Sequence, residues 1–131
     1  MSRLVSNQGH SQISTEGMQA MARSGSVGVI LPTTAYILRL KPPPVRDMIA
    51  HGMIVGLGSD FNPNAYCMSM PMVMHLACVN LRMSLAESLA AATINSAHSL
   101  GRSKSHGSIE VQHDLDNHTR SSNLSLTRLE K

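Results

Sequence analysis

Two short apolar runs along the chain predict buried strands, each followed by a loop. Residues 27–31 (Val-Gly-Val-Ile-Leu) and 53–58 (Met-Ile-Val-Gly-Leu-Gly) are apolar at almost every position instead of alternating with polar residues. Continuous apolar runs of this length are typical of parallel strands that are covered on both faces. A loop is expected over residues 33–36 after the first run, and a polar loop over residues 59–64 after the second.

Helical periodicity and capping residues predict four helices around these strands. They are expected over residues 14–24, 45–51, 70–81 and 84–100. Ser14 or Thr15 can accept a hydrogen bond from a free N–H of the first turn, and Gly25 is suited to end that helix. Ser84 and Glu87 have the spacing of a capping box, which favours a helix start at this point.

The order of these elements predicts an α/β fold with parallel strands. Two strands cannot form an independent parallel sheet that is covered on both faces, and a complete (β/α)8 barrel takes about 250 residues. The chain of 131 residues is therefore expected to be part of something larger or to need a partner. We expect an irregular segment over residues 1–13, an ordered portion over 14–108 and a polar, disordered tail over 109–131.

Composition narrows the class of protein without identifying it. Hydrophobic residues make up 42% of the chain and charged residues 15%, which indicates a mostly ordered chain. The net charge is +3 and the basic residues are scattered, so no nucleic-acid partner is expected. The sequence shows neither an apolar run long enough to span a bilayer nor a secretory leader, so we expect a cytoplasmic protein without a membrane partner. Cys67 and Cys78 are expected to be buried free thiols.

The strongest candidate for chemistry is Asp60, which directly follows the second predicted strand. Ligands of parallel α/β folds bind at the carboxyl ends of the strands, where this side chain should lie. A partly desolvated carboxylate there needs a metal ion, a hydrogen bond or a cation. Asp60 could be a metal ligand that also accepts a proton, or it could cap the following turn through an Asx motif. The pattern alone leaves both interpretations open.

Residues 25–107 resemble the late barrel segment of the imidazolonepropionase family, which consists of metal-dependent amidohydrolases. Four motifs carry the resemblance, in the order and spacing of that family: Leu31-Pro32-Thr33-Thr34, Gly58-Ser59-Asp60-Phe61-Asn62-Pro63, Ala91-Ala92-Thr93-Ile94-Asn95-Ser96-Ala97 and Leu100-Gly101. The resemblance implies a partial (β/α)8 (TIM) barrel, made of its last two strands and the helices that follow, with an irregular tail.

The resemblance also implies roles for individual residues. Asp60 would be a ligand of a single zinc or iron ion and would take the proton from the attacking water. Asn62 would hydrogen-bond the substrate, and Asn64 and Ala65 would touch the same ligand. The implied reaction is hydrolysis of 4-imidazolone-5-propanoate to N-formimidoyl-L-glutamate in histidine degradation. The metal would lower the pKa of bound water and polarise the ring carbonyl. The expected partner is this small molecule, and homo-oligomer formation is left open.

The sequence departs from the family pattern in ways that bear on activity. The chain contains no His-x-His, the pair that supplies metal ligands after the first strand of the family barrel. The histidine expected at the end of the sixth strand falls on Gly9, and His10 is one position away, so we assign it no catalytic role. Because a catalytic zinc ion needs three or four protein ligands, we expect the chain to be truncated and inactive alone.

Two other functions compete with this reading. The chain could be a non-catalytic fragment or isoform that only associates with other chains through the faces that a complete barrel covers. The Asp60 motif could also serve a different cyclic-amide hydrolase or deaminase, although the flanking residues Phe61 to Pro63 favour imidazolonepropionase. Arg39 and Lys41 could meet a carboxylate substrate or form a solvated face.

Overall fold

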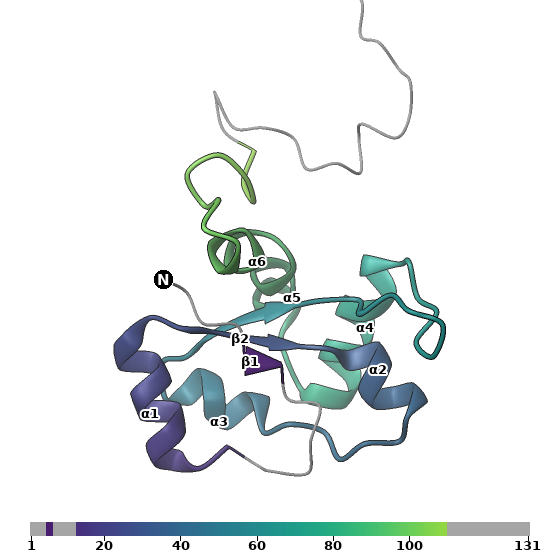
Figure 1. Cartoon of the computed structure of the whole chain (residues 1–131), viewed down its shortest axis with the longest axis horizontal. Coiled ribbons are helices and arrows are strands. Elements are labelled where there is room, and N and C mark those ends of the chain that lie inside the picture. The colour runs from purple at the N-terminus through teal and green to yellow at the C-terminus, as the bar shows by residue number, and fades with distance from the viewer. Residues whose placement is uncertain (1–4, 7–12, 110–131) are drawn as a thin grey trace, which may run out of the picture.

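A parallel sheet forms the centre of the chain in a computed structural model that describes residues 5–6 and 13–109 (Figure 1). Within these residues the sheet has three strands in the order β1 (Val5–Ser6), β2 (Val27–Ile30) and β3 (Ile54–Leu57). Both neighbouring pairs are parallel. This arrangement confirms the predicted α/β class and both predicted strands.

The segment expected to be irregular, residues 1–13, contributes strand β1. Val5 and Ser6 pair with Gly28 and Val29 of β2, so the sheet extends one strand beyond the two that were predicted. Two paired residues are too few to produce an apolar run, so no periodic pattern indicates a strand there. Residues 110–131, which hold nearly all of the predicted tail, lie outside the described part of the chain, as do Gly9 and His10.

The helices of the described residues surround the sheet. They are α1 (Thr15–Ser24), α2 (Pro32–Ile37), α3 (Val45–Ala50), α4 (Met70–Leu81), α5 (Leu85–Ala92) and α6 (Ile94–Ser99). Figure 1 shows α1 and α3 on one side of the sheet and α5 and α6 on the other. The helix predicted over 70–81 is confirmed at both ends. In the part of the chain that is described, no helix has the length and apolar character of a membrane span.

The predicted capping residues form the expected hydrogen bonds or turns at the helix ends. The Ser14 hydroxyl accepts a hydrogen bond from Gly17 N–H at 3.1 Å, and Gly25 ends α1 in the left-handed conformation with φ 65°. At α5, Ser84 and Glu87 form the complete capping box, in which each side chain accepts from the other residue's backbone N–H. The sequence positions of both helix starts are therefore set by local hydrogen bonds.

The loop predicted over residues 33–36 is wrong, because helix α2 occupies this stretch. Pro32 is the first residue of α2, where its fixed φ suits a helix and its missing N–H costs no hydrogen bond. The helix ends within two turns, since Arg39 already adopts φ 52°. Strand β2 is therefore joined directly to a short helix whose first turn lies at the carboxyl end of the sheet.

The single helix predicted over 84–100 is divided into α5 and α6 at Thr93. Thr93 has φ −117° and ψ −93°, and its hydroxyl donates to Leu89 O at 2.7 Å. The break redirects the chain so that Asn95 and Ser96 reach β3: Asn95 Nδ2 donates to Val55 O at 2.8 Å and Ser96 Oγ donates to Leu57 O at 3.1 Å. These two bonds explain why one continuous helix does not form.

Those carbonyls lie on the edge of β3 that faces away from β2. Gly58 N–H donates to Ile30 O at 3.0 Å, so the backbone groups of Gly58 point toward β2. Backbone groups alternate between the two edges of an extended strand, so those of Val55 and Leu57 point to the opposite edge. Side chains of α6 therefore satisfy two carbonyls of β3 at the edge where a neighbouring strand would otherwise pair.

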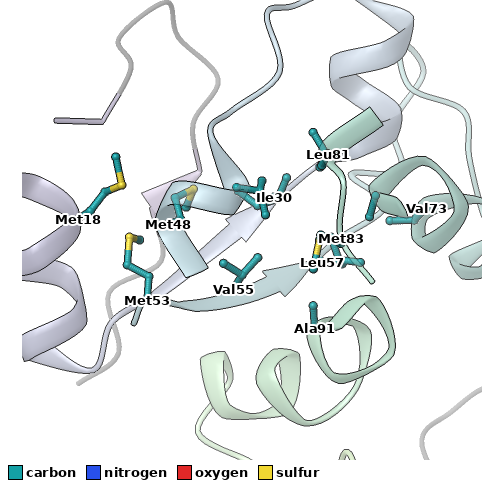
Figure 2. Packing of buried hydrophobic residues seen from close by; sticks show 12 residues of the cluster. Met18, Ile30, Met48, Met53, Val55, Leu57, Val73, Leu81, Met83 and Ala91 are labelled. Carbon is teal, nitrogen blue, oxygen red and sulfur yellow. The ribbon is translucent and has the colours of Figure 1, made fainter. Parts of the chain in front are cut away.

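Methionine and aliphatic side chains fill the core (Figure 2). Ile30 of β2 and Val55 and Leu57 of β3 lie in one cluster with Val73 of α4 and Ala91 of α5. Met18, Met48 and Met53 complete this cluster beside α1 and α3. Flexible methionines fill irregular space where the chain has few aromatic residues. The buried strands thereby hold their carboxyl ends in fixed positions.

Gly107 should tolerate a side chain far less than Gly101. Both have positive φ, 92° and 69°, but a Cβ on Gly107 would lie 2.7 Å from Ile94 Cα, whereas a Cβ on Gly101 meets nothing within 4 Å. We expect Gly101→Ala to lower the free energy of unfolding by about 1–2 kcal/mol through backbone strain. Gly107→Ala should lower the free energy of unfolding by the same strain and by about 1–3 kcal/mol more, because the added Cβ overpacks against α6. Urea denaturation measures both losses, and equal losses would show that Gly107 does not lie against Ile94 of α6.

Glu87 should make stability depend on acid pH. The backbone N–H of Ser84 and the Arg46 guanidinium, 2.7 and 2.6 Å from Glu87 Oε2, lower the pKa of Glu87 below its ordinary value of 4.5. The carboxylate therefore stabilises the fold fully above pH 4.5, and this contribution is lost as the pH falls through the lower folded pKa.

We expect Glu87→Gln to reduce the drop in urea midpoint between about pH 7 and about pH 3. Asp47→Asn, which removes an exposed acid from the first turn of α3, controls for the loss of one negative charge. An unchanged pH dependence in Glu87→Gln would contradict the role of this capping carboxylate.

Candidate functional site

The carboxyl ends of β2 and β3 lie side by side and place two polar segments together. Helix α2 begins two residues after β2 ends, and the loop over residues 58–69 follows β3. The register that pairs Ile30 with Leu57 brings both segments to the same edge of the sheet. Ligands of parallel α/β folds bind at this edge, so the arrangement fits the expected location of the site.

Asp60 lies at this edge, half-buried, in the left-handed conformation with φ 50°. Asp tolerates this conformation better than most residues, but a non-glycine residue adopts it only where its surroundings hold it. Its Oδ2 atom accepts a hydrogen bond from the Thr34 hydroxyl at 2.9 Å. The side chain is therefore tied to the first turn of α2 across the sheet edge.

A second hydroxyl group forms a hydrogen bond between the same two segments, helix α2 and the loop after β3. Thr33 Oγ1 donates to the backbone carbonyl of Ser59 at 2.9 Å. Thr33 and Thr34 are both buried, and each bonds a residue that is 26 positions away in the sequence. The Thr-Thr pair thus joins α2 to the loop immediately beyond the strands, and sequence reasoning had not assigned it this role. The sequence signal for this role is the pair of adjacent hydroxyl side chains that comes shortly after the apolar run of β2.

Asn62 holds the turn that follows Asp60. Its Nδ2 donates to Asp60 O at 2.6 Å, and its Oδ1 accepts from Asn64 N–H at 2.9 Å and from Ala65 N–H at 3.2 Å. The last two contacts form an Asx-type turn. The side chain expected to bind a substrate therefore also organises the loop.

Asn64 and Ala65 close the turn in different ways. The side chain of Asn64 is exposed, while Ala65 is only 1% exposed and pairs with Asn62 in an antiparallel bridge. Next to the turn, the rings of Phe61 and Tyr66 pack at a tilt, with centroids 5.0 Å apart. The loop is thus compact, and it presents polar side chains and the ring pair rather than bare backbone.

A metal ion would find one suitable ligand among the described residues at this edge. Carboxylate oxygen is a ligand that zinc accepts, and the bond from Thr34 holds one oxygen of Asp60 in place. Across residues 5–6 and 13–109, however, no group of three His, Cys, Asp or Glu side chains could hold an ion. Asp60 therefore fits as one member of a ligand set that this segment does not complete.

The other candidate residues lie elsewhere. Cys67 and Cys78 are free, as expected, but both are half-buried, so the expected burial of these thiols is wrong. Arg39 and Lys41 are exposed. Arg39 lines a separate pocket of about 280 Å³ between α2 and α4, on the side of α2 away from Thr33 and Thr34.

Comparison with known proteins gives one consistent picture. Residues 10–116 match the sequence pattern of the amidohydrolase family. The chain is 66% identical over 100 residues to the "probable imidazolonepropionase" of Mus musculus, which covers 76% of this chain and 24% of that protein. It is 48% identical over 98 residues to the imidazolonepropionase of Geobacillus thermodenitrificans, which covers 74% of this chain and 23% of the relative. The chain thus spans about a quarter of the length of these relatives.

A solved structure shows the same fold. The guanine deaminase of E. coli superposes with a TM-score of 0.68 over 79% of this chain and 24% of that one, at 19% sequence identity. Identity this low supports the architecture alone. The segment of three strands and their helices is therefore a portion of a larger barrel fold, as the sequence predicted.

Loss of the Asn62 side chain should open the turn. Asn62→Ala removes the acceptor for Asn64 N–H, and we expect fast hydrogen exchange at that amide and a loss of about 1–3 kcal/mol in the free energy of unfolding. Asn62→Asp keeps the acceptor oxygen but replaces the amide donor to Asp60 O, so the Asn64 amide should stay protected. Protection that persists in Asn62→Ala would contradict this account of the turn.

Proposed function

The chain belongs to the amidohydrolase family, and from this premise we propose that it supplies the C-terminal barrel segment of an imidazolonepropionase. The reaction would be hydrolysis of 4-imidazolone-5-propanoate to N-formimidoyl-L-glutamate. The observation that carries the proposal is the half-buried Asp60 carboxylate at the carboxyl end of β3, held by the Thr34 hydroxyl. The names of the similar proteins support the choice of substrate, which acts as the small-molecule partner.

In this proposal Asp60 has two roles at the sheet edge. It would be one ligand of a single zinc or iron ion, and it would accept the proton of the attacking water. The bound ion supplies the acidity that generates a nucleophile from water at neutral pH and polarises the ring carbonyl. A carboxylate has two oxygens and about four lone pairs, so one side chain can serve both roles.

Asn62 has one hydrogen-bonding group left for a substrate. Its Oδ1 accepts from two backbone N–H groups, and one Nδ2 hydrogen is directed to Asp60 O. A side-chain amide has two N–H donors, so the second can donate to a carbonyl or carboxylate oxygen of the substrate. We therefore assign Asn62 as a hydrogen-bond donor to the substrate.

Asn64 and Ala65 complete the proposed contact surface. Asn64 can reach the substrate through its exposed side-chain amide. The N–H of Ala65 donates to Asn62, and its carbonyl accepts from Cys67 N–H at 2.9 Å. A contact from the backbone of Ala65 therefore requires the loop to open when the substrate binds.

We propose that the chain alone has negligible turnover. We also propose that it is located in the cytoplasm and has neither a nucleic acid nor a membrane as partner. One carboxylate cannot replace the three or four ligands of a catalytic ion. The remaining ligands would come from the part of a complete barrel that this chain does not contain.

A second candidate function is association without catalysis. Helix α4 exposes Val79 (62%), and α5 exposes Leu85 (72%) and Leu89 (52%). Exposed apolar side chains on two adjoining helices favour contact with another chain or a second copy. Size-exclusion chromatography with light scattering distinguishes this function, because association should then occur without metal or substrate.

A complete barrel tests the enzymatic proposal. We would replace the matching segment of the Mus musculus relative by residues 14–108 and follow the loss of substrate absorbance. The chimera should hydrolyse imidazolone propanoate, and Asp60→Asn should lower kcat/KM by about 10²–10⁴-fold because the proton acceptor is lost. Asp47→Asn, which removes an exposed carboxylate from the first turn of α3, is the matched control.

One outcome would count against the role of Asp60, and another against the negligible turnover of the chain alone. Full activity in the Asp60→Asn chimera would remove Asp60 from the reaction. Stoichiometric zinc or iron and turnover in the unmodified 131-residue chain would show that it assembles a complete site by itself.

A further inference from the structure

Thr34 is placed to fix the orientation of the Asp60 carboxylate. We infer that Thr34 is a positioning residue for Asp60, an inference that rests on the proposed function of that carboxylate. Its hydroxyl donates to Asp60 Oδ2 at 2.9 Å, and the side chain of Thr34 does not itself touch the reacting atoms in this account. The contribution of Thr34 is therefore geometric.

The position of the Thr34 hydroxyl is rigidly defined. Thr34 is 5% exposed and lies in the first turn of α2, directly after the buried Pro32 and Thr33. A β-branched side chain in a helix has few χ1 rotamers, and the surrounding packing leaves the hydroxyl little freedom. The donor is thus preorganised before any ligand arrives.

The position of Asp60 relative to Thr34 is also defined. The ladder that pairs Ile30 with Leu57 is continued by the bond from Gly58 N–H to Ile30 O, and then by the bond from Thr33 Oγ1 to Ser59 O. The bond from Thr34 to Asp60 is the next contact outward. The strand register therefore determines which residue of α2 faces Asp60.

Asp60 needs such a partner more than an ordinary surface carboxylate does. Its backbone has φ 50°, a conformation that a non-glycine residue keeps only where its surroundings hold it. Backbone conformation fixes where Cβ lies, but the carboxylate can still turn about χ2, which is a broad torsion. A hydrogen bond to Oδ2 restricts that rotation, so the carboxylate plane keeps one orientation.

Orientation matters because the same carboxylate is proposed to bind an ion and to accept a proton. Groups that hydrogen-bond a metal ligand set its direction, and their loss typically lowers metal affinity or activity by about 10–100-fold. We expect that effect from loss of the Thr34 hydroxyl, with little change in KM because Thr34 does not contact the substrate.

The test uses three variants of the chimeric barrel. Thr34→Val removes the hydroxyl and keeps the branched shape, Thr34→Ser keeps the hydroxyl, and Ser88→Ala removes another buried hydroxyl, which bonds Met74 O between α5 and α4. Zinc affinity is measured by competition with a chelator, together with kcat/KM. Thr34→Val should lower both by about 10–100-fold, Thr34→Ser should restore most of the loss, and Ser88→Ala should affect only thermal stability.

A second readout is independent of the proposed reaction. In the 131-residue chain, the ¹³C resonance of the Asp60 carboxyl carbon should move in Thr34→Val and stay in place in Ser88→Ala, whose hydroxyl bonds the Met74 backbone instead. Thr34→Ala provides the same comparison if Thr34→Val does not fold.

The outcomes separate the two proposals. An inactive but zinc-binding chimera with the expected zinc affinities would overturn the proposed reaction and support the role of Thr34. Equal zinc affinities in Thr34→Val and Ser88→Ala, a failure of Thr34→Ser to restore them, or an unchanged Asp60 resonance would each overturn the role of Thr34.

Discussion

The parallel pairing of β2 with β3 determines where the polar side chains of the candidate site lie. Because side chains alternate along a strand, a shift of β3 by one residue would turn Val55 and Leu57 away from the cluster that they share with Ile30 of β2. The same shift would move α2 relative to the loop after β3 and would separate Thr34 from Asp60. Burial of a few aliphatic residues thus fixes a hydrogen bond that lies just beyond the ends of the strands.

Local signals were enough to predict most of the fold. The apolar runs identified β2 and β3, and the caps at Ser14, Gly25 and Ser84 placed helix ends correctly, since each of these signals lies within four residues of its effect. Features that depend on contacts across the fold were not predictable in this way. The division at Thr93 follows from bonds between α6 and β3, about 40 residues away, and strand β1 exists only because β2 provides its partner.

The candidate site shows the same limit. The position of Asp60 followed from the rule that polar residues after parallel strands share one edge. Its partner Thr34 did not, because that contact joins residues from separate strands and depends on an unpredicted helix. Asn62 illustrates another difficulty: the sequence indicates that an amide is present, but only the structure shows that most of its hydrogen-bonding capacity is used within its own loop.

The contacts of Asn95 and Ser96 with β3 also affect how the sheet can meet other chains. An unpaired strand edge is a template for strand addition, and proteins commonly block such edges to prevent aggregation. Here the carbonyls of Val55 and Leu57 are already occupied by α6. Any strand that pairs with this edge of β3, including one that would close a complete barrel, must therefore displace the side chains of Asn95 and Ser96 from these carbonyls.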